Sequence, residues 1–521
     1  MLHSIWQTAL TAVRGSILGA AVLSAAVGLA ATAGPAAAAG TASPLLEAVR
    51  NGRTETVRAL LKQRANANVA EADGTTALHL AVRDRNMAVA EALIRAGANV
   101  KAANRYGVTG LSLAATNGDA AMMAALLKAG ADANTAMPDG ETVLMTAAKT
   151  GKADAVKMLL ASGATVDTVE PTAGQTALMW AAAENHPEAV KVLLEAGADV
   201  NKRTKTLTFP PFKWGVVGMV STLLPKGSWT PLMYAARQNS IEAAKAMVAA
   251  GAEINAVDPE GTTPLLLAIF NAHYDMAAAL IEMGADPGKA DLAGTTPLYA
   301  ATDMHTLAPM VGRPSPKPSG VLEAPAIVTM LLKKGADPNA ALKRPAFGKH
   351  HDLNGDAFMG DGSTPLMRAA RTGDVEIMRI LLDGGANAHA RRRDLATALF
   401  VAASGRRGGL PTGPRTIPGA SNIEAIKMLV AAGLDVNAFN LNGQTALHVA
   451  AQRGDDDIVK LLVELGASMD LRDKQKRTAL DLAAGVGVRG RTPEDDAPVR
   501  DSTVKLLKDL AAKQTASSAS R

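Results

Sequence analysis

The stretch GQTALHVAAQRGDDDIVKLLVELG, residues 443–466, predicts two short helices joined by a turn. Thr445 follows a turn glycine and is a natural N-cap, because its hydroxyl can accept a hydrogen bond from the open amides of the first helical turn. The second helix carries large apolar residues on one face, at Ile458, Leu461, Leu462 and Leu465. Gly466 ends that helix, since the left-handed residue after a helix is least strained without a Cβ atom.

The same unit recurs along the chain, with the spacing that separates Gly97 from Gly130 as its base period. The glycine that ends the second helix recurs at Gly97, Gly130, Gly163, Gly197, Gly251, Gly284, Gly335, Gly385, Gly433 and Gly466. The threonine that begins the first helix recurs at Thr76, Thr109, Thr142, Thr176, Thr230, Thr263, Thr296, Thr364, Thr397, Thr445 and Thr478. Four repeats are stretched by insertions. The first unit lacks the threonine and has Arg64 in place of the glycine, so we expect a capping unit followed by eleven repeats.

This pattern resembles the ankyrin repeat. The motifs that carry the resemblance include TALHLAV from Thr76, TPLMYAA from Thr230 and TPLMRAA from Thr364. The resemblance extends from Ser43 to about Lys513. It implies an all-α solenoid of stacked helix–turn–helix units with projecting hairpins or loops and several long insertions. It also implies a concave face made of hairpin tips and first helices, which in this family usually binds another protein.

Composition and repeat boundaries predict an ordered array between two dissimilar ends. The chain has 521 residues, 48% hydrophobic and 20% charged, which is ordinary globular composition. The expected organisation is a signal peptide (1–39), an N-terminal capping repeat (40–72), an array (73–475), a C-terminal capping repeat (476–513) and a disordered tail (514–521). The insertions lie near 203–227, 303–325, 341–361 and 404–421, and their Pro and Gly content indicates loops.

The N-terminus is typical of an export signal. Arg14 precedes an apolar run from Ile17 to Ala33, and Ala37 and Ala39 supply an A-x-A cleavage site. We therefore predict a periplasmic or secreted protein. The alternative is an uncleaved inner-membrane anchor, which the Ala- and Gly-rich run makes a weak span. The absence of cysteine excludes disulfides, cysteine-ligated zinc and iron–sulfur clusters.

The insertion at 203–227, called the flap below, concentrates aromatic residues in a chain that is only 3% aromatic. Phe209, Phe212 and Trp214 lie within it and Trp229 follows it, and a short helix is expected between Trp214 and Pro225. Aromatic residues are common anchors of protein interfaces, so the flap is a candidate partner-binding surface. Two other interpretations stay open: a flap that buries its own aromatics over the groove, and shallow insertion into a membrane surface.

The threonine register places a set of residues at hairpin tips and on the exposed side of first helices. The predicted partner-binding residues, flap aromatics included, are Arg105, Tyr106, Lys149, Phe209, Phe212, Trp214, Trp229, Arg237, Phe270, Arg371, Arg392, Arg393 and Arg453. The set is basic and partly aromatic, which favours another protein with an acidic or mixed surface as the partner. Any one exposed arginine is equally consistent with a solvated face. Trp180 and Tyr234 are expected to pack against the core.

No motif predicts catalysis. His79 and His448 occupy the fourth place of TALH, where the resemblance implies a histidine that braces neighbouring loops. His350, His351 and Asp352 are weak candidate metal ligands, because adjacent histidines in an extended segment point to opposite sides. We expect no cofactor, no nucleic acid, no membrane contact after signal cleavage, and a monomer. The alternatives are a metal-dependent or enzymatic site in the insertions and a membrane-anchored envelope scaffold.

Overall fold

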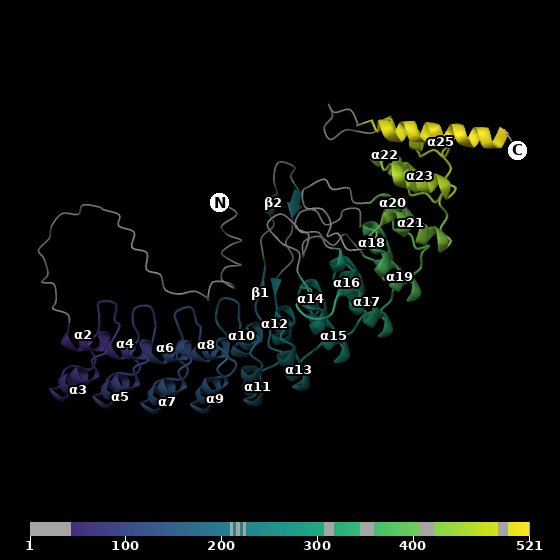
Figure 1. Cartoon of the computed structure of the whole chain (residues 1–521). Helices are drawn as coiled ribbons and strands as arrows, with labels where there is room; N and C mark the ends of the chain where they lie inside the picture. The colour runs from purple at the N-terminus through teal and green to yellow at the C-terminus, as the bar shows by residue number, and fades with distance from the viewer. Residues whose placement is uncertain are drawn as a thin grey trace, which may run out of the picture.

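The computed structural model describes residues 43–208, 212–214, 219–221, 226–306, 317–343, 359–405, 421–487 and 499–519. It is a curved stack of paired helices, as predicted (Figure 1). The first helices are α2 (Pro44–Arg50), α4 (Ala77–Arg83), α6 (Gly110–Asn117), α8 (Val143–Lys149), α10 (Ala177–Ala183), α12 (Pro231–Gln238), α14 (Pro264–Phe270), α16 (Pro297–His305), α18 (Pro365–Thr372), α20 (Ala398–Ala403), α22 (Ala446–Arg453) and α24 (Ala479–Ala483).

The second helices form a parallel row behind the first. They are α3 (Thr54–Lys62), α5 (Met87–Arg95), α7 (Ala120–Lys128), α9 (Ala153–Ala161), α11 (Pro187–Glu195), α13 (Ile241–Ala249), α15 (Tyr274–Glu282), α17 (Ala324–Lys333), α19 (Val375–Asp383), α21 (Asn422–Ala431), α23 (Asp456–Glu464) and α25 (Asp501–Ala519). The array bends so that the first-helix row lies on the inner side of the curve (Figure 1). Helix α25 continues through Ala519, so it extends into the segment 514–521 that the sequence predicts to be disordered.

The threonine N-caps and their histidine partners hold the units together. The Thr76 hydroxyl accepts from the His79 backbone N–H, and the Thr76 backbone N–H donates to His79 Nδ1 at 3.0 Å. The other ring nitrogen, Nε2, lies 2.9 Å from the Val108 carbonyl of the next hairpin. His448 makes the same contacts with Thr445 and the Arg477 carbonyl. The predicted bracing role of both histidines is confirmed.

One continuous core of small and aliphatic side chains runs the length of the array. Alanine pairs such as Ala114 and Ala115 are fully buried where neighbouring first helices approach each other, and leucines and methionines fill the space between the two rows. Gly97 and Gly466 follow second helices with φ of 86° and 94°, the left-handed conformation that favours glycine. Arg64 takes the same conformation in the first unit, at φ 62°.

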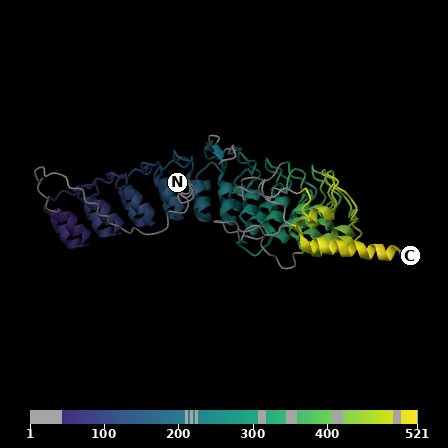
Figure 2. The ribbon, with the colours of Figure 1, turned by 90° about the horizontal axis from the view of Figure 1, so that it is seen from above.

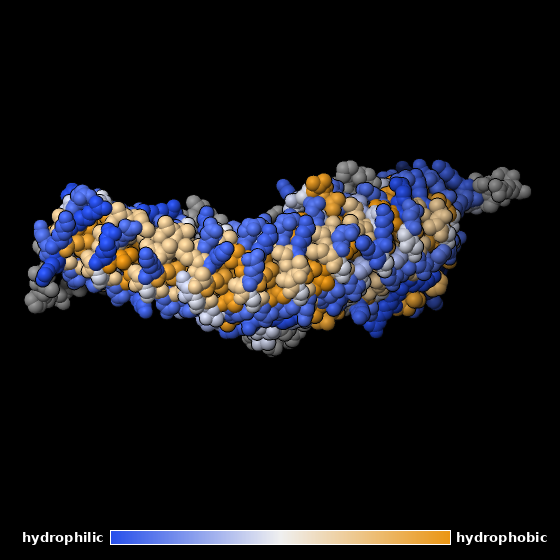
Figure 3. Space-filling model, turned by 90° about the horizontal axis from the view of Figure 1, so that it is seen from below, coloured by the Kyte–Doolittle hydropathy of each residue, from blue (hydrophilic) through white to orange (hydrophobic). Residues whose placement is uncertain are grey.

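Hairpins project along one long edge of the array (Figure 2). Hydrophilic and hydrophobic residues are interspersed on the outer face of the array, and neither kind gathers in one patch (Figure 3). Successive hairpins are linked by backbone hydrogen bonds, as from Arg105 N–H to the Asp73 carbonyl at 2.8 Å. This linkage fixes each hairpin relative to its neighbour, so the tips form a continuous edge.

The flap contains short β-strands. Strand β1 (Thr206–Leu207) pairs with β4 (Lys226–Gly227), and β2 (Phe212–Trp214) pairs with β3 (Met219–Ser221), both antiparallel. The short helix expected between Trp214 and Pro225 is therefore wrong. The segment is too short for a stable isolated helix and contains glycines and β-branched valines, which disfavour one.

Candidate functional site

Five side chains from three successive units form two contacting groups along the first-helix row, one of them next to the base of the flap. They are Lys149 at the end of α8, Trp180 within α10, Trp229 just before α12, and Tyr234 and Arg237 on α12. We call these five residues the groove cluster. Each is partly buried, and Trp180, Trp229 and Tyr234 pack against the core. The packing predicted for Trp180 and Tyr234 is thus confirmed, although both also keep part of their surface in the cluster.

The groove cluster alternates cations with aromatic rings. Lys149 Nζ lies over the Trp180 ring, 4.7 Å from its centroid, and Arg237 Cζ lies 5.6 Å from the centroid of Trp229. Trp229 and Tyr234 meet edge to face, with centroids 5.4 Å apart and an interplanar angle of 69°. Cation–π and edge-to-face contacts of this geometry each contribute about 0.5–1.5 kcal/mol. These contacts hold Lys149 against Trp180 in one group, and Trp229, Tyr234 and Arg237 together in the other.

A hydrogen bond links α12 to the preceding unit. Gln175 Nε2 donates to the Tyr234 hydroxyl at 2.8 Å. Burial raises the pKa of the Tyr234 phenol, and the Gln175 hydrogen bond opposes that change. Tyr234 therefore stays protonated at neutral pH, and its O–H can donate to a further acceptor.

The base of the flap is fixed to the hairpins on both sides. Trp229 exchanges hydrogen bonds with Thr204 across the base, at 3.0 and 2.9 Å. Arg203 donates to the Ser228 carbonyl at 3.0 Å and to the Val257 carbonyl of the next hairpin at 2.8 Å. A second link to that hairpin is the ion pair between Lys226 Nζ and Glu260 Oε1, at 2.7 Å. Trp229 thus belongs both to the base of the flap and to the groove cluster.

The other flap aromatics are placed only in part. Phe212 pairs with Ser221 and Trp214 pairs with Met219 in the β2–β3 ladder, which sets their backbone but not the contacts of their side chains. Phe209 lies outside the described residues, as do His350, His351 and Asp352. The predicted role of these residues in binding stays a prediction.

Two of the predicted partner-binding residues are buried, so their expected exposure is wrong. Phe270 is 7% exposed and belongs to the core with every other side chain of α14. Arg371 is 2% exposed, and its guanidinium donates to the Ser404 carbonyl of the next unit at 2.8 Å. Both share the repeat position of Lys149 and Arg237, but the packing of the adjacent unit decides whether that position reaches the surface.

A buried polar cluster that was not predicted from the sequence lies between α16 and α18. Arg368, 4% exposed, forms an ion pair with Asp303. His305 Nδ1 lies 2.7 Å from Oδ2 of the fully buried Asp374, whose other oxygen caps α19. The sequence does contain a signal, because Arg368 in TPLMRAA stands at the repeat position of Trp180 and Tyr234. Arg368 pairs with Asp303 and His305 contacts Asp374, so these polar groups are partners of one another and have a structural role.

The remaining predicted residues lie apart from the groove cluster. Arg105 and Tyr106 share a hairpin tip near the N-terminal end, with Arg105 Cζ 4.8 Å from the Tyr106 ring centroid. Arg453 ends α22 and is half-buried. Arg392 and Arg393 stand at a hairpin tip near the C-terminal end. The predicted set therefore does not form a single site.

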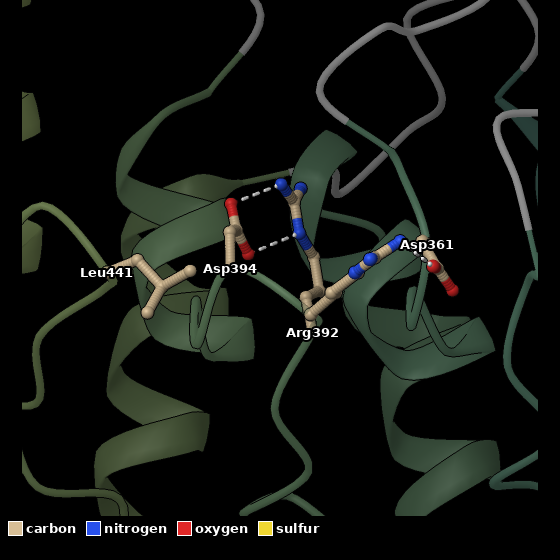
Figure 4. Close-up of a pocket in the computed structure, with 5 residues that line it drawn as sticks. Asp361, Arg392, Asp394 and Leu441 are labelled. Carbon is tan, nitrogen blue, oxygen red and sulfur yellow. Dashed lines mark hydrogen bonds and ion pairs between the residues drawn. The ribbon is translucent and has the colours of Figure 1, made fainter.

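Arg392 and Arg393 line an open pocket of about 300 Å³ together with Asp361, Asp394 and Leu441 (Figure 4). Arg392 makes a two-pronged contact with Asp394, at 3.0 and 2.6 Å, and only 13% of its side chain is exposed. Arg393 is 84% exposed and touches Asp361 through a single 3.3 Å contact. Arg392 is fixed by its carboxylate, whereas Arg393 is open to another anion.

Two other kinds of site find no support in the part of the chain that the structure describes. Within those residues, no group of three or more His, Asp or Glu side chains is placed to hold a metal ion. No described helix is both long enough and apolar enough to cross a membrane.

Known proteins share the repeat pattern. Models of ankyrin repeats (3 copies) match residues 37–104, 111–204, 215–291, 232–308, 321–410 and 419–491, which together make up well over half of the chain. Ankyrin repeat and SOCS box protein 11 of Homo sapiens is 30% identical over 125 residues, 23% of this chain and 33% of that protein. A transient receptor potential cation channel subfamily A member 1 homolog of Caenorhabditis elegans is 30% identical over 122 residues, 23% of this chain and 9% of that protein.

Two solved structures that resemble this chain are ankyrin repeat domains. The ankyrin repeat domain of human ASB11 aligns over 47% of this chain and 100% of its own, with 29% identity and a TM-score of 0.39. That of Bcl-3 aligns over 46% of this chain and 98% of its own, with 25% identity and a TM-score of 0.38. The chain spans a third or less of the length of the two relatives above, so what those whole proteins do is theirs. The repeat-by-repeat match over most of its length shows that this chain belongs to the ankyrin repeat family.

Proposed function

We propose that this chain is an exported ankyrin-repeat protein that binds another protein through the inner face of its array. Ankyrin repeat domains in general mediate protein–protein interaction and are typically non-catalytic scaffolds. The observation that carries the proposal is the groove cluster, where two cations each lie over an aromatic ring on neighbouring units and one of those rings, Trp229, adjoins the base of the flap. Tryptophan, tyrosine and arginine are the residues most enriched among the energetic centres of protein interfaces.

The partner best suited to this site has an acidic or mixed surface. Lys149 and Arg237 each lie over an aromatic ring and present positive charge beside apolar area. A carboxylate of the partner would pair with either cation, while its apolar neighbours cover the rings. The flap adds selectivity, because its base is fixed to the hairpins on both sides and its strands extend from a defined point.

Site-specific photocrosslinking tests the groove. A benzoylphenylalanine replaces Ala183, which ends α10 at the repeat position of Lys149 and Arg237. A control variant carries it at Lys128, at the exposed end of α7 on the outer row. We expect one protein to be crosslinked from position 183, and the crosslink to be lost when Arg237→Glu is added. Crosslinking from position 128 alone would place the interface on the other side of the array.

Export is part of the same proposal and has its own measurement. Sequencing the N-terminus of the protein purified from its native host should give a chain that begins after Ala39. A chain that still begins at Met1 and sediments with membranes would support the anchored alternative.

A further inference from the structure

The tips of three successive hairpins near the C-terminal end carry a repeated pattern of side chains. In each hairpin, one residue stands six places before the N-cap threonine and another stands four places before it. The first set is Arg391, Phe439 and Arg472, and the second set is Arg393, Leu441 and Lys474. Both sets run cation, apolar residue, cation along the edge. We call these six residues the tip array.

The backbone places the two sets in register. Arg391 forms a β-bridge with Thr397, and Phe439 forms the equivalent bridge with Thr445. In the second set, the Leu441 N–H donates to the Asp394 carbonyl of the preceding hairpin at 2.8 Å, and the Lys474 N–H donates to the Asn442 carbonyl at 2.9 Å. The three hairpins are therefore tied together, and the six side chains are held in two parallel rows.

All six side chains are open to solvent. Phe439 is 57% exposed and Leu441 is 48% exposed, which is unusual for large apolar residues at neighbouring positions. Arg391, Arg472 and Lys474 are exposed as well, and Arg393 is 84% exposed.

The pattern is confined to this end of the array. At the N-terminal end, the residues in the bridged position are Ala70, Ala103 and Ala136. The fold itself therefore needs nothing larger than alanine at this position. The large side chains at the C-terminal end are not explained by the stability of the hairpin.

One of the four cations of the tip array has a carboxylate within ion-pair distance, since Arg393 touches Asp361 at 3.3 Å. Asp394 is held by Arg392, and the fully buried side chain of Asp473 is held by Arg477 at 2.7 Å. Among the residues described, no carboxylate lies within ion-pair distance of Arg391, Arg472 or Lys474. The Arg391 guanidinium instead donates to the Phe439 carbonyl at 3.3 Å, which keeps the cation beside the apolar pair.

We propose that the tip array binds an extended acidic segment of a protein partner, with a hydrophobic residue of that segment seated on Phe439 and Leu441 between the flanking cations. Charge complementarity selects the acidic segment, and the central apolar pair selects the hydrophobic residue. Because the rows are preorganised by backbone hydrogen bonds, binding orders only the ligand. The proposal rests on the proposed function in that the ligand is a protein, but it names a surface distinct from the groove cluster.

A defined peptide tests the tip array on the full mature chain. The probe is a fluorescein-labelled peptide with four glutamates on each side of a central Leu-Ser-Phe, and its binding is followed by fluorescence anisotropy. We expect saturable binding that weakens as salt is raised. Arg391→Glu with Lys474→Glu should weaken binding about tenfold, because two attractive exposed pairs become repulsive. Phe439→Ser with Leu441→Ser should weaken it about threefold or more through lost apolar contact.

Matched controls separate this surface from a general effect of charge. Lys128→Glu with Lys157→Glu makes the same charge change on outer helices and should leave binding within about twofold of the unmodified chain. Arg237→Glu in the groove cluster should also leave peptide binding unchanged, so failure of the tip array and failure of the groove are told apart. A circular dichroism spectrum confirms that each variant is folded.

Three results would overturn the proposal. One is no saturable binding of the peptide to the intact chain. Another is equal weakening by the tip variants and the outer-helix control. The third is binding that depends on the tip residues but is tighter to another probe than to the peptide. Tighter binding to mixed phosphatidylcholine–phosphatidylserine vesicles would assign the surface to a membrane, and tighter binding to a short thymidine oligomer would assign it to nucleic acid.

Discussion

Protonation of the histidine braces should loosen the units that contain them. His79 Nδ1 accepts the Thr76 backbone N–H at 3.0 Å, so Nε2 carries the proton and donates to the Val108 carbonyl at 2.9 Å. A second proton on Nδ1 would turn that nitrogen into a donor that faces the Thr76 N–H, so the hydrogen bond between Thr76 and His79 Nδ1 would be lost. Burial lowers the pKa of His79, and it lowers the pKa of His448 in the equivalent place. Both imidazoles are therefore held neutral.

The direction of the pH effect follows from these shifts. In the unfolded chain each histidine takes up a proton below its ordinary pKa near 6.5, whereas in the folded chain it does so only at lower pH. The contribution of the two histidines to stability should thus be constant above about pH 7 and fall as the pH drops below 6.5. For each of the two histidines, the free energy of unfolding falls by at most about 1.4 kcal/mol per pH unit below 6.5, until the pH reaches the pKa of that histidine in the folded chain.

Hydrogen exchange between pH 7.5 and 5.5, corrected for the intrinsic rates, measures the local opening free energy. We expect protection in α4 to fall by up to about 1.4 kcal/mol. The unit of α20 is a control within the same chain, because Phe400 takes the place of the histidine after Thr397. The variant His79→Gln should remove the pH dependence of α4. Equal loss of protection in α4 and α20, or none in either, would refute the reasoning.

Three further changes probe the flap, the core and the groove. Gly227→Ala should disorder the base of the flap at a cost of about 1–3 kcal/mol, because Gly227 has a φ of 92° and a Cβ there would come 2.1 Å from the Lys205 carbonyl oxygen. Limited proteolysis would show this as faster cleavage in the flap. Arg371→Ala should destabilise the array by about 2 kcal/mol in urea unfolding, whereas Arg393→Ala at a tip should change it by less than about 0.5 kcal/mol. Trp229→Ala should lower the free energy of unfolding by about 1–3 kcal/mol, because the ring contacts with Tyr234 and Arg237 are lost. If the groove cluster is the interface, the same change should abolish the crosslink from position 183.

The fold could be predicted because its signals are local and repeated. Thr445 and Gly466 mark where helices begin and end through their own backbone chemistry, whatever surrounds them. The same holds for the bracing role of His79, because the residues it contacts stand at fixed distances in each repeat. The spacing of these signals then places every unit after the first, and each insertion only delays the next threonine.

Burial at a given repeat position could not be predicted in the same way. Arg237 is half-buried beside Trp229, but Arg371 at the equivalent position is covered and pairs with a carbonyl of the next unit. Phe270, again equivalent, is part of the core. Position in the repeat fixes which way a side chain points, but what the adjacent unit places beside it decides whether the surface there is open. That information lies one unit away in the sequence.

Trp229 belongs to both the groove cluster and the base of the flap, so a substitution there changes both sites. Trp229→Ala removes a ring from the cluster and also loosens the residue that exchanges hydrogen bonds with Thr204 across the base of the flap. Lost binding in that variant would therefore not say which of the two contacts the partner. Gly227→Ala separates them, because it displaces β4 from Lys205 and leaves the side chains of Trp229, Tyr234 and Arg237 in the chain. Binding that survives the glycine change but not the tryptophan change belongs to the groove, and binding lost in both requires the flap.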